Sequence, residues 1–338
     1  METTINVGII GIGGMGRTHF SCYRNNPAAK IVALCDLDEG KRTGQWGTME
    51  INIGSEEADT GDMSGIASYE QYSDLLADPE VRLVDICLPT RLHAEVSIAA
   101  LMAGKDVFCE KPMAWTVDEC REIQKAIAES GRQFFVGHCL RYWSHYLKIN
   151  DYLQSGEYGA WRYARLARSG GAPTWSWNNW LMTGSQSGGA VFDMHIHDAD
   201  AALWWFGKPE GVHAAGVVVD GLPLTVDANW SYPGGRVVNL HGSWDLNSGP
   251  FRYAFDVVFE KATVSFDSAV DDSVFRISTT AGAETVNIDA PNAYQYEIDD
   301  ILDCLKSGRK MERVTPAGSE IAVQVVREEL RQIESSTR

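Results

Sequence analysis

The chain has 338 residues, of which 44% are hydrophobic and 22% are charged. This length predicts two domains, and the composition is typical of a globular protein. The formal net charge of −17 argues against nucleic acid and anionic membrane surfaces as partners, because both bind clusters of Lys and Arg. No apolar run approaches the ~20 residues of a membrane span, and the N-terminus lacks the features of a signal peptide. We therefore expect no membrane association and a cytoplasmic location, in which the seven scattered cysteines stay free thiols.

The first predicted strand, residues 5–10, leads directly into a glycine-rich turn and a helix. The turn fits the pattern G-x-G-x-x-G. In this pattern the first glycine allows a tight turn, the second lets a pyrophosphate approach the backbone, and the third lets the helix pack close to the strand. The pattern predicts dinucleotide binding by Gly11, Gly13, Gly14, Met15 and Gly16.

The second predicted strand, residues 31–35, ends at Asp36. A carboxylate at this distance from the glycine turn accepts hydrogen bonds from the adenosine ribose of a bound dinucleotide. It also repels the 2′-phosphate that distinguishes NADP from NAD, so we expect NAD as the cofactor. Lys41 and Arg42 follow within one turn and offset part of this repulsion, which leaves NADP as the less favoured alternative.

Three more buried strands, residues 82–88, 107–109 and 133–137, alternate with helices. This alternation predicts a doubly wound parallel sheet, that is, an α/β Rossmann domain over residues 1–137. Ligands of such sheets bind where the strands end. The residues that follow two of these strands are therefore further cofactor-binding candidates, although His93 could instead pack locally: Pro89, Thr90, His93, Glu110 and Lys111.

Beyond residue 137 the pattern changes to longer alternating strands separated by turn signals. Eight such strands, between residues 163 and 288, predict an α+β domain with a large, mostly antiparallel open sheet over residues 138–338. Two helices are predicted within it, at residues 188–206 and 316–335. The second of these, at the C-terminus, can pack back on the first domain.

The helix predicted at residues 188–206 carries side chains suited to acid–base chemistry. At helical spacing Asp193, His197 and Asp200 share one face, so Asp200 can orient the imidazole of His197. His195 lies two residues from His197, and two such side chains cannot reach one ion from a regular helix, so we predict no metal site. The alternative is a solvated acidic face with an incidental histidine.

These motifs resemble those of the Gfo/Idh/MocA oxidoreductases, a family that includes sugar and inositol dehydrogenases. The resemblance extends over nearly the whole chain, from the glycine turn through Glu110-Lys111-Pro112 to the helix with Asp193 and His197. It implies a Rossmann domain followed by an α+β domain whose sheet forms the interface of a homodimer or homotetramer. It also implies catalysis by Lys111, Asp193 and His197 in a cleft between the domains, where the same three residues bind the substrate.

Two segments depart from the common family pattern. Cys139-Leu140-Arg141 replaces the usual Asn-Arg-Arg, so of these residues only Arg141 is carried over as a substrate-binding candidate.

The loop at residues 172–180 is rich in tryptophan, and indole rings pack well on sugar faces. Trp175 and Trp177, together with Trp180, are therefore candidates for contact with the substrate, although they could equally anchor the loop or a subunit contact.

The expected activity is hydride transfer between NAD and a secondary alcohol or ketone of a sugar, inositol or related polyol. His197 would accept the hydroxyl proton, Lys111 would stabilise negative charge on the substrate oxygen, and Asp193 would bind a neighbouring hydroxyl. Two alternatives remain open. One is an NAD-dependent glycosidase or lyase that oxidises its substrate only transiently, and the other is a non-catalytic NAD-binding regulatory protein.

Overall fold

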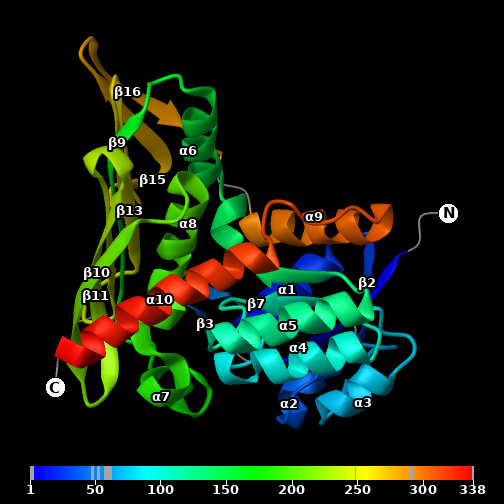
Figure 1. Cartoon of the computed structure of the whole chain (residues 1–338). Coiled ribbons are helices and arrows are strands. Elements are labelled where there is room, and N and C mark those ends of the chain that lie inside the picture. The colour runs from blue at the N-terminus through cyan, green and yellow to red at the C-terminus, as the bar shows by residue number, and fades with distance from the viewer. Residues whose placement is uncertain are drawn as a thin grey trace. The chain divides into compact units, whose positions relative to one another are not determined.

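The computed structural model describes residues 4–46, 49–51, 54–56, 63–247, 249–289 and 292–336 (Figure 1). The chain divides into two compact units. Unit 1 comprises Met1–Cys139 and Tyr294–Glu320, and unit 2 comprises Leu140–Ala293 and Ile321–Arg338. Among the described residues, no helix combines the length and the apolar character that crossing a membrane requires.

Unit 1 is built on a six-stranded sheet with the order β5-β2-β1-β6-β7-β8, in which every neighbouring pair is parallel. The predicted doubly wound sheet is therefore confirmed. Its strands are β1 (Ile5–Ile10), β2 (Ala29–Cys35), β5 (Ala67–Tyr69), β6 (Leu83–Ile86), β7 (Asp106–Glu110) and β8 (Phe134–Gly137), and β3 (Met49–Ile51) pairs with β4 (Gly54–Glu56) in a separate two-stranded sheet. Its helices are α1 (Gly14–Arg24), α2 (Glu39–Arg42), α3 (Tyr72–Ala77), η1 (Thr90–Leu92), α4 (His93–Met102), α5 (Val117–Ser130) and α9 (Ala293–Ser307).

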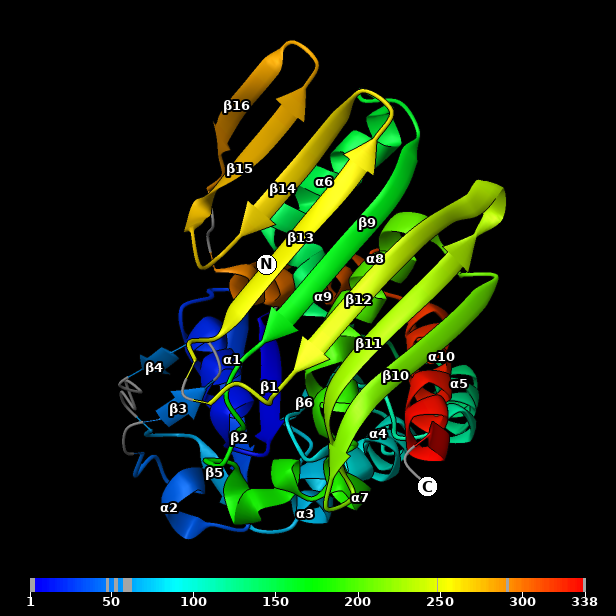
Figure 2. The same ribbon diagram turned by 90° about the vertical axis from the view of Figure 1, so that its left-hand side faces the viewer.

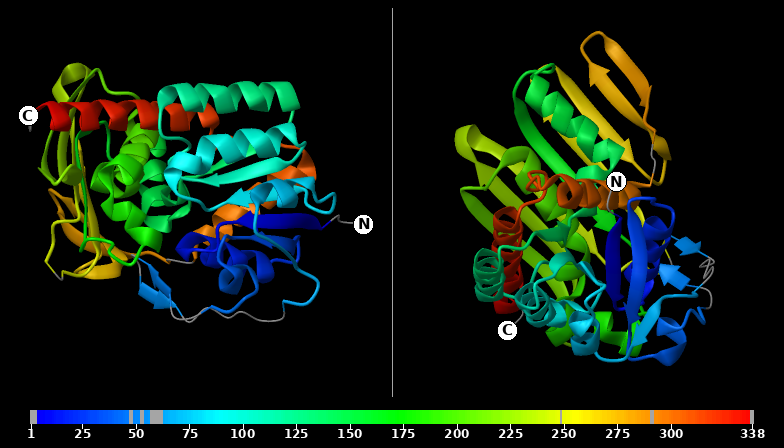
Figure 3. Two further views of the ribbon diagram at one scale, coloured as in Figure 1. Left: turned by 90° about the horizontal axis from the view of Figure 1, so that it is seen from below. Right: turned by 90° about the vertical axis from the view of Figure 1, so that its right-hand side faces the viewer.

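Helices cover both faces of this sheet. In Figures 1 and 3, α4 and α5 lie on one face, and α1 and α9 lie on the other. The sequence analysis did not predict α9, which follows the sheet of unit 2 in the chain and contributes to the core of unit 1. Its buried residues pack in the same apolar cluster as Ile9 and Phe108 of the sheet: Ile298, Ile301, Leu302, Cys304 and Leu305.

Unit 2 is built on an eight-stranded sheet with the order β10-β11-β12-β9-β13-β14-β15-β16. All eight predicted strands are present, and the pairing is antiparallel except between β12 and β9. The sheet is thus mostly antiparallel, as expected, with the first strand of the unit inserted at its centre. The strands are β9 (Trp161–Ser169), β10 (Gly211–Val219), β11 (Leu222–Tyr232), β12 (Arg236–Ser243), β13 (Arg252–Phe259), β14 (Ala262–Asp267), β15 (Asp271–Thr279) and β16 (Gly282–Asn287).

Helices α6 (Ser144–Ser155) and α8 (Ile196–Phe206) lie behind this sheet in Figure 2, and the face turned toward the viewer carries no described helix of unit 2. The sequence analysis did not predict α6. Helix α8 continues a π-helical turn, η4 (Val191–His195), so the predicted helix at residues 188–206 is not a regular α-helix throughout. The remaining helices are η2 (Cys139–Tyr142), η3 (Trp177–Met182), α7 (Gly184–Ser187), η5 (Pro233–Gly235) and α10 (Pro316–Ser336), which belongs partly to each unit.

Candidate active site

The glycine turn between β1 and α1 has the geometry that dinucleotide binding requires. Gly11 has a φ of +91°, and a Cβ atom there would lie 2.5 Å from the carbonyl oxygen of Cys87. A Cβ on Gly16 would lie 2.0 Å from the carbonyl oxygen of Gly11, so only glycine lets α1 begin this close to the turn. At Gly13 a Cβ would meet nothing within 4 Å. The turn therefore closes on itself at its ends and leaves its middle open to a ligand.

Asp36 follows β2 and contacts the same turn. Its Oδ2 accepts a hydrogen bond from the backbone N–H of Ile12 at 2.8 Å, and its Oδ1 accepts one from Asp38 at 2.9 Å. A carboxylate has about four acceptor positions, so two intrachain bonds leave acceptor capacity for ribose hydroxyls. The side chain of Arg42 donates to the backbone carbonyls of Asp36 and Leu37, which brings its charge near this carboxylate.

The segment after β6 supplies Pro89, Thr90 and His93. His93 is 1% exposed, and its two ring nitrogens lie 2.6 Å from the carbonyl oxygen of Pro112 and 2.7 Å from that of Leu88. Burial lowers the pKa of His93 in spite of these two acceptors, so a neutral ring donates to one carbonyl at a time. His93 thus connects the segments after β6 and β7. This packing role is the alternative to cofactor binding that the sequence analysis named for His93.

Glu110 ends β7 and Lys111 follows it at the same edge of the sheet as the glycine turn, because β7 lies next to β6 and β6 next to β1. Oε2 of Glu110 accepts a hydrogen bond from the backbone N–H of Lys111 at 2.9 Å. Glu110 is 6% exposed. Burial would raise the pKa of Glu110, but its hydrogen bond with His19 and the charges of His19 and Lys111 lower it instead.

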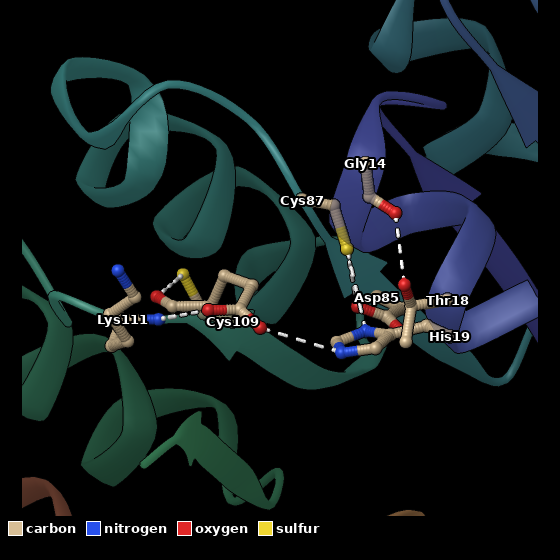
Figure 4. A network of polar contacts seen from close by, with 8 residues as sticks. Gly14, Thr18, His19, Asp85, Cys87, Cys109 and Lys111 are labelled. Atoms are coloured by element: carbon tan, nitrogen blue, oxygen red, sulfur yellow. Dashed lines mark hydrogen bonds and ion pairs between the residues drawn. The ribbon is translucent and has the colours of Figure 1, made fainter. Parts of the chain in front are cut away.

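His19, on α1, is a residue of this site that the sequence analysis missed. It contacts Asp85 on β6 and Cys87 just after β6, as Figure 4 shows, and it also forms an ion pair with Glu110 at the end of β7. Ligand-capable atoms of His19, Asp85 and Cys87 all lie within 4.8 Å of one another, which among the described residues makes them the group best placed to approach a metal ion. Their separations of 2.9 to 3.4 Å are also those of hydrogen bonds. The expectation that the protein needs no metal stays a prediction.

In unit 2, the predicted acid–base pair of Asp193 and His197 lies on the helical segment formed by η4 and α8. Buried ion pairs fix other residues of this segment. Nε2 of His195 lies 2.8 Å from Oε2 of Glu329 on α10, and both side chains are 0% exposed. Oε1 of Glu329 accepts a second hydrogen bond from Nε1 of Trp230 on β11. Burial would lower the pKa of His195, but the charge and hydrogen bond of Glu329 raise it.

Two further ion pairs hold the same segment. Asp198 is bound by Arg168 of β9, whose Nε and Nη2 each donate at 3.1 Å, and Asp200 is bound by Arg141, whose Nε and Nη2 donate at 2.9 and 2.7 Å. Arg141 is 8% exposed. The observed role of Arg141 and Asp200 is therefore this bidentate pair, whereas substrate binding by Arg141 and orientation of His197 by Asp200 stay predictions.

Asp193 and His197 are the two remaining acid–base side chains of the segment, and both are partly exposed, whereas His195, Asp198 and Asp200 are buried. Asp193 lies in the π-helical turn and His197 in the first turn of α8. The sequence analysis placed Asp200 on the same helix face as Asp193 and His197, but the structure buries Asp200 in its pair with Arg141, a distant partner that helical spacing does not reveal.

The three tryptophans of the loop before α7 differ in their surroundings. Trp175 and Trp177 are 39% and 50% exposed, whereas Trp180 packs against an apolar cluster that includes Leu181 and Met194. Asn178 and Asn179 adopt positive φ angles of 49° and 54°, a conformation that asparagine tolerates better than most residues. Trp180 therefore anchors the loop, and the other two indoles are accessible.

Comparison with known proteins identifies the family. Over residues 5–138 the chain matches the sequence model described as the oxidoreductase family with an NAD-binding Rossmann fold, and over residues 146–265 it matches the GFO/IDH/MocA C-terminal domain. The chain therefore belongs to the Gfo/Idh/MocA oxidoreductase family, and unit 1 contains its NAD-binding Rossmann domain.

Individual relatives align over part of their length. YrbE, an uncharacterized oxidoreductase of Bacillus subtilis (strain 168), is 32% identical over 208 residues, which are 62% of this chain and 55% of YrbE. Inositol 2-dehydrogenase of Salmonella typhimurium (strain LT2) is 32% identical over 158 residues, which are 46% of this chain and 43% of that protein. The chain thus spans about half the length of these curated relatives. A structure of levoglucosan dehydrogenase in complex with NADH and levoglucosan shares the fold, with a TM-score of 0.83, 19% identity and coverage of 98% of each chain.

The buried pair of His195 and Glu329 predicts a pH-dependent contribution to stability. Replacing Glu329 by Leu leaves His195 and the indole N–H of Trp230 without an acceptor, and we expect the free energy of unfolding to fall by about 3–5 kcal/mol. Glu329→Gln keeps an acceptor of similar size and should cost less. Urea unfolding followed by circular dichroism measures both effects.

The sign of the pH dependence follows from the raised pKa of His195. Its stabilisation is fully present below the unfolded pKa of about 6.5 and is lost as the pH rises through the higher folded pKa. The difference between wild type and Glu329→Gln should therefore be largest near pH ~6 and shrink as the pH rises. A difference that grows with pH would contradict the assignment.

Proposed function

We propose that this protein is an NAD-dependent dehydrogenase that transfers a hydride between the nicotinamide and a secondary alcohol or ketone of a sugar, inositol or related polyol. The proposal rests on which side chains are exposed on the helical segment formed by η4 and α8 in unit 2. Three of its charged or imidazole side chains are buried in ion pairs, and the two left partly exposed, Asp193 and His197, are the ones suited to acid–base catalysis. Lys111, at the ligand-binding edge of unit 1, supplies the cation that completes the set.

The residues of unit 1 fit NAD. The open position at Gly13 gives a pyrophosphate access to the backbone, and the N-terminus of α1 favours an anion there. The remaining acceptor positions of Asp36 suit the ribose hydroxyls of NAD and disfavour the 2′-phosphate of NADP. Pro89, Thr90 and Glu110 lie at the same sheet edge, and His93 supports them. Bound NAD supplies the hydride acceptor, which none of the protein side chains can provide.

The chain itself supplies the proton chemistry. We assign to His197 the removal of the hydroxyl proton, since a neutral imidazole is a suitable base near neutral pH. Lys111 donates a hydrogen bond to the substrate oxygen and stabilises the negative charge that develops on it. Asp193 binds a neighbouring hydroxyl and stabilises a positive charge on His197. Trp175 and Trp177 offer accessible indole faces for the apolar side of a sugar or cyclitol ring.

The substrate class is supported by the relatives. An inositol 2-dehydrogenase aligns with this chain at 32% identity, and levoglucosan dehydrogenase shares its fold. Their names specify inositol and levoglucosan as the compounds that are dehydrogenated, and a polyhydroxylated ring of this kind suits the combination of a carboxylate, an imidazole and exposed indoles. A panel of inositols, sugars and keto-sugars tested with NAD, NADH, NADP and NADPH, read by nicotinamide absorbance, should identify at least one substrate.

Other outcomes of this panel would overturn the proposal. Release of product from a glycoside, with NAD required but without net NADH, would indicate transient oxidation in a glycosidase or lyase. NAD binding without turnover of any compound would instead favour a regulatory role.

Replacing Lys111 by Met should lower kcat by about a hundredfold or more, because a preorganised donor to the reacting oxygen is lost. NAD binding, measured by fluorescence titration, should persist. Lys125→Met is a matched control, because this lysine on α5 is 75% exposed at its side chain. A wild-type kcat in the Lys111→Met enzyme would show that Lys111 is not catalytic.

Replacing Asp36 by Ser should weaken NAD binding about tenfold to a hundredfold and affect NADP much less. Asp36→Asn is the matched variant, because it keeps an acceptor for the N–H of Ile12 while removing the charge that repels the 2′-phosphate. We expect its ratio of NADP to NAD affinity to rise. Equal losses for both cofactors in both variants would remove the basis for the NAD preference.

We further propose that the chain forms a homodimer or homotetramer through the face of the unit 2 sheet that no described helix of that unit covers (Figure 2). Sedimentation equilibrium should give two or four times the chain mass of 37.3 kDa, and a monomer would contradict this assembly. The cytoplasmic location expected from the sequence stays a prediction.

A further inference from the structure

We infer that His19 is a positioning residue, which holds the buried carboxylate of Glu110 so that this carboxylate fixes the backbone of Lys111 at the end of β7. The inference extends the proposed function, on which the catalytic role of Lys111 rests. All the residues involved belong to unit 1.

His19 bridges two carboxylates that come from neighbouring strands. Its Nδ1 lies 2.9 Å from Oδ2 of Asp85 on β6 (Figure 4), and its Nε2 lies 3.4 Å from Oε1 of Glu110 on β7. The side chains of His19 and Asp85 are 1% and 0% exposed, and that of Glu110 is 8% exposed. The ring also stacks on Phe108, with centroids 5.0 Å apart and planes inclined by 15°. His19 is therefore held on its face and by the hydrogen bond at Nδ1, while its Nε2 lies within ion-pair distance of Glu110.

Glu110 in turn constrains the backbone of Lys111. One carboxylate oxygen of Glu110 faces His19, and the other accepts a hydrogen bond from the backbone N–H of Lys111 at 2.9 Å. Glu110 also packs against β8, since a Cβ atom on Gly137 would lie 3.2 Å from Cδ and Oε1 of Glu110. The carboxylate therefore has little freedom to turn. The continuous contact from Asp85 through His19 and Glu110 ends at the backbone of Lys111.

The carboxylates of the cluster favour a positively charged His19. Burial would lower the pKa of His19, but the charge of Asp85 and its hydrogen bond with the ring raise it well above its usual value. The other titratable groups around the ring are Glu110, Tyr23 of α1 and Tyr294 of α9, whose ring centroid lies 6.4 Å from that of His19.

Burial raises the pKa of Cys87, which keeps this neighbour a neutral thiol. A single imidazolium therefore compensates two buried carboxylates. Without that charge the buried Glu110 carboxylate is destabilised, and Lys111 loses a fixed hydrogen-bond acceptor.

The test compares amide hydrogen exchange in the segment 107–115 with steady-state kinetics. His19→Phe keeps an aromatic ring stacked on Phe108 but removes both ring nitrogens. His19→Gln keeps one hydrogen-bond donor and replaces the Phe variant in the test if that variant does not fold. We expect exchange in this segment about tenfold faster in the Phe variant, with a smaller increase in the Gln variant. We expect kcat to fall about tenfold to a hundredfold with unchanged NAD affinity, since small displacements of a catalytic group have effects of this size.

Two further variants separate positioning from general loss of structure. In the double variant His19→Phe/Glu110→Gln, residue 110 is neutral and still offers Lys111 an acceptor, so we expect exchange protection to recover relative to His19→Phe alone. Cys87→Ala removes a neighbour of His19 that does not contact the Glu110 carboxylate, and it should leave exchange in the segment unchanged.

Unchanged exchange in the His19 variants would overturn the inference, as would additive losses in the double variant. An equal effect of Cys87→Ala would also overturn it, because the thiol would then be the determining contact. Faster exchange with an unchanged kcat would exclude a role in positioning Lys111. If the wild-type protein oxidises no compound of the substrate panel, the proposed function fails, while exchange in the double variant still decides whether His19 holds Lys111 through Glu110.

Discussion

The buried carboxylate of Glu110 is the group on which the ligand-binding edge of unit 1 depends. It lies at the end of β7, where a charge is costly unless it is paired and hydrogen-bonded. One of its oxygens accepts the backbone N–H of Lys111, and the other faces the ring of His19. His93 adds a second connection by joining the segment after β7 to the segment after β6. The Glu-Lys-Pro motif thus combines a structural acid with the lysine that we propose to be catalytic.

The same principle organises the helical segment of unit 2. Buried pairs with Glu329, Arg168 and Arg141 fix His195 of the π-helical turn and Asp198 and Asp200 of α8. Such pairs add little net stability compared with apolar packing, but removing one partner is costly, and so they specify one orientation of the segment. Asp193 and His197 are partly exposed on the same helical segment, whose orientation these buried ion pairs fix.

Much of this could be predicted from the sequence, because the patterns concerned are local. The glycine turn, Asp36 at the end of β2 and the alternation of strands and helices all depend on spacing along the chain. The partners of buried charges could not be predicted, because they are far apart in the sequence. Asp85 is a charge within an otherwise apolar predicted strand, but its partner His19 lies 66 residues away on a helix without any pattern that marks it. Helix α9 was missed although its apolar residues recur at helical spacing, and its packing in unit 1 could not be predicted because it follows the whole sheet of unit 2.

The central claim is that a hydride passes between a carbinol carbon and NAD on this protein. Sugars and cyclitols deuterated at their carbinol carbons, incubated with the protein and NAD, test this claim most directly. We predict that one of them yields NADH with a single deuterium on the nicotinamide, detected by mass spectrometry, and that its oxidation shows a primary isotope effect under single-turnover conditions. Absence of deuterated NADH for every compound, in a protein shown to bind NAD, would contradict it.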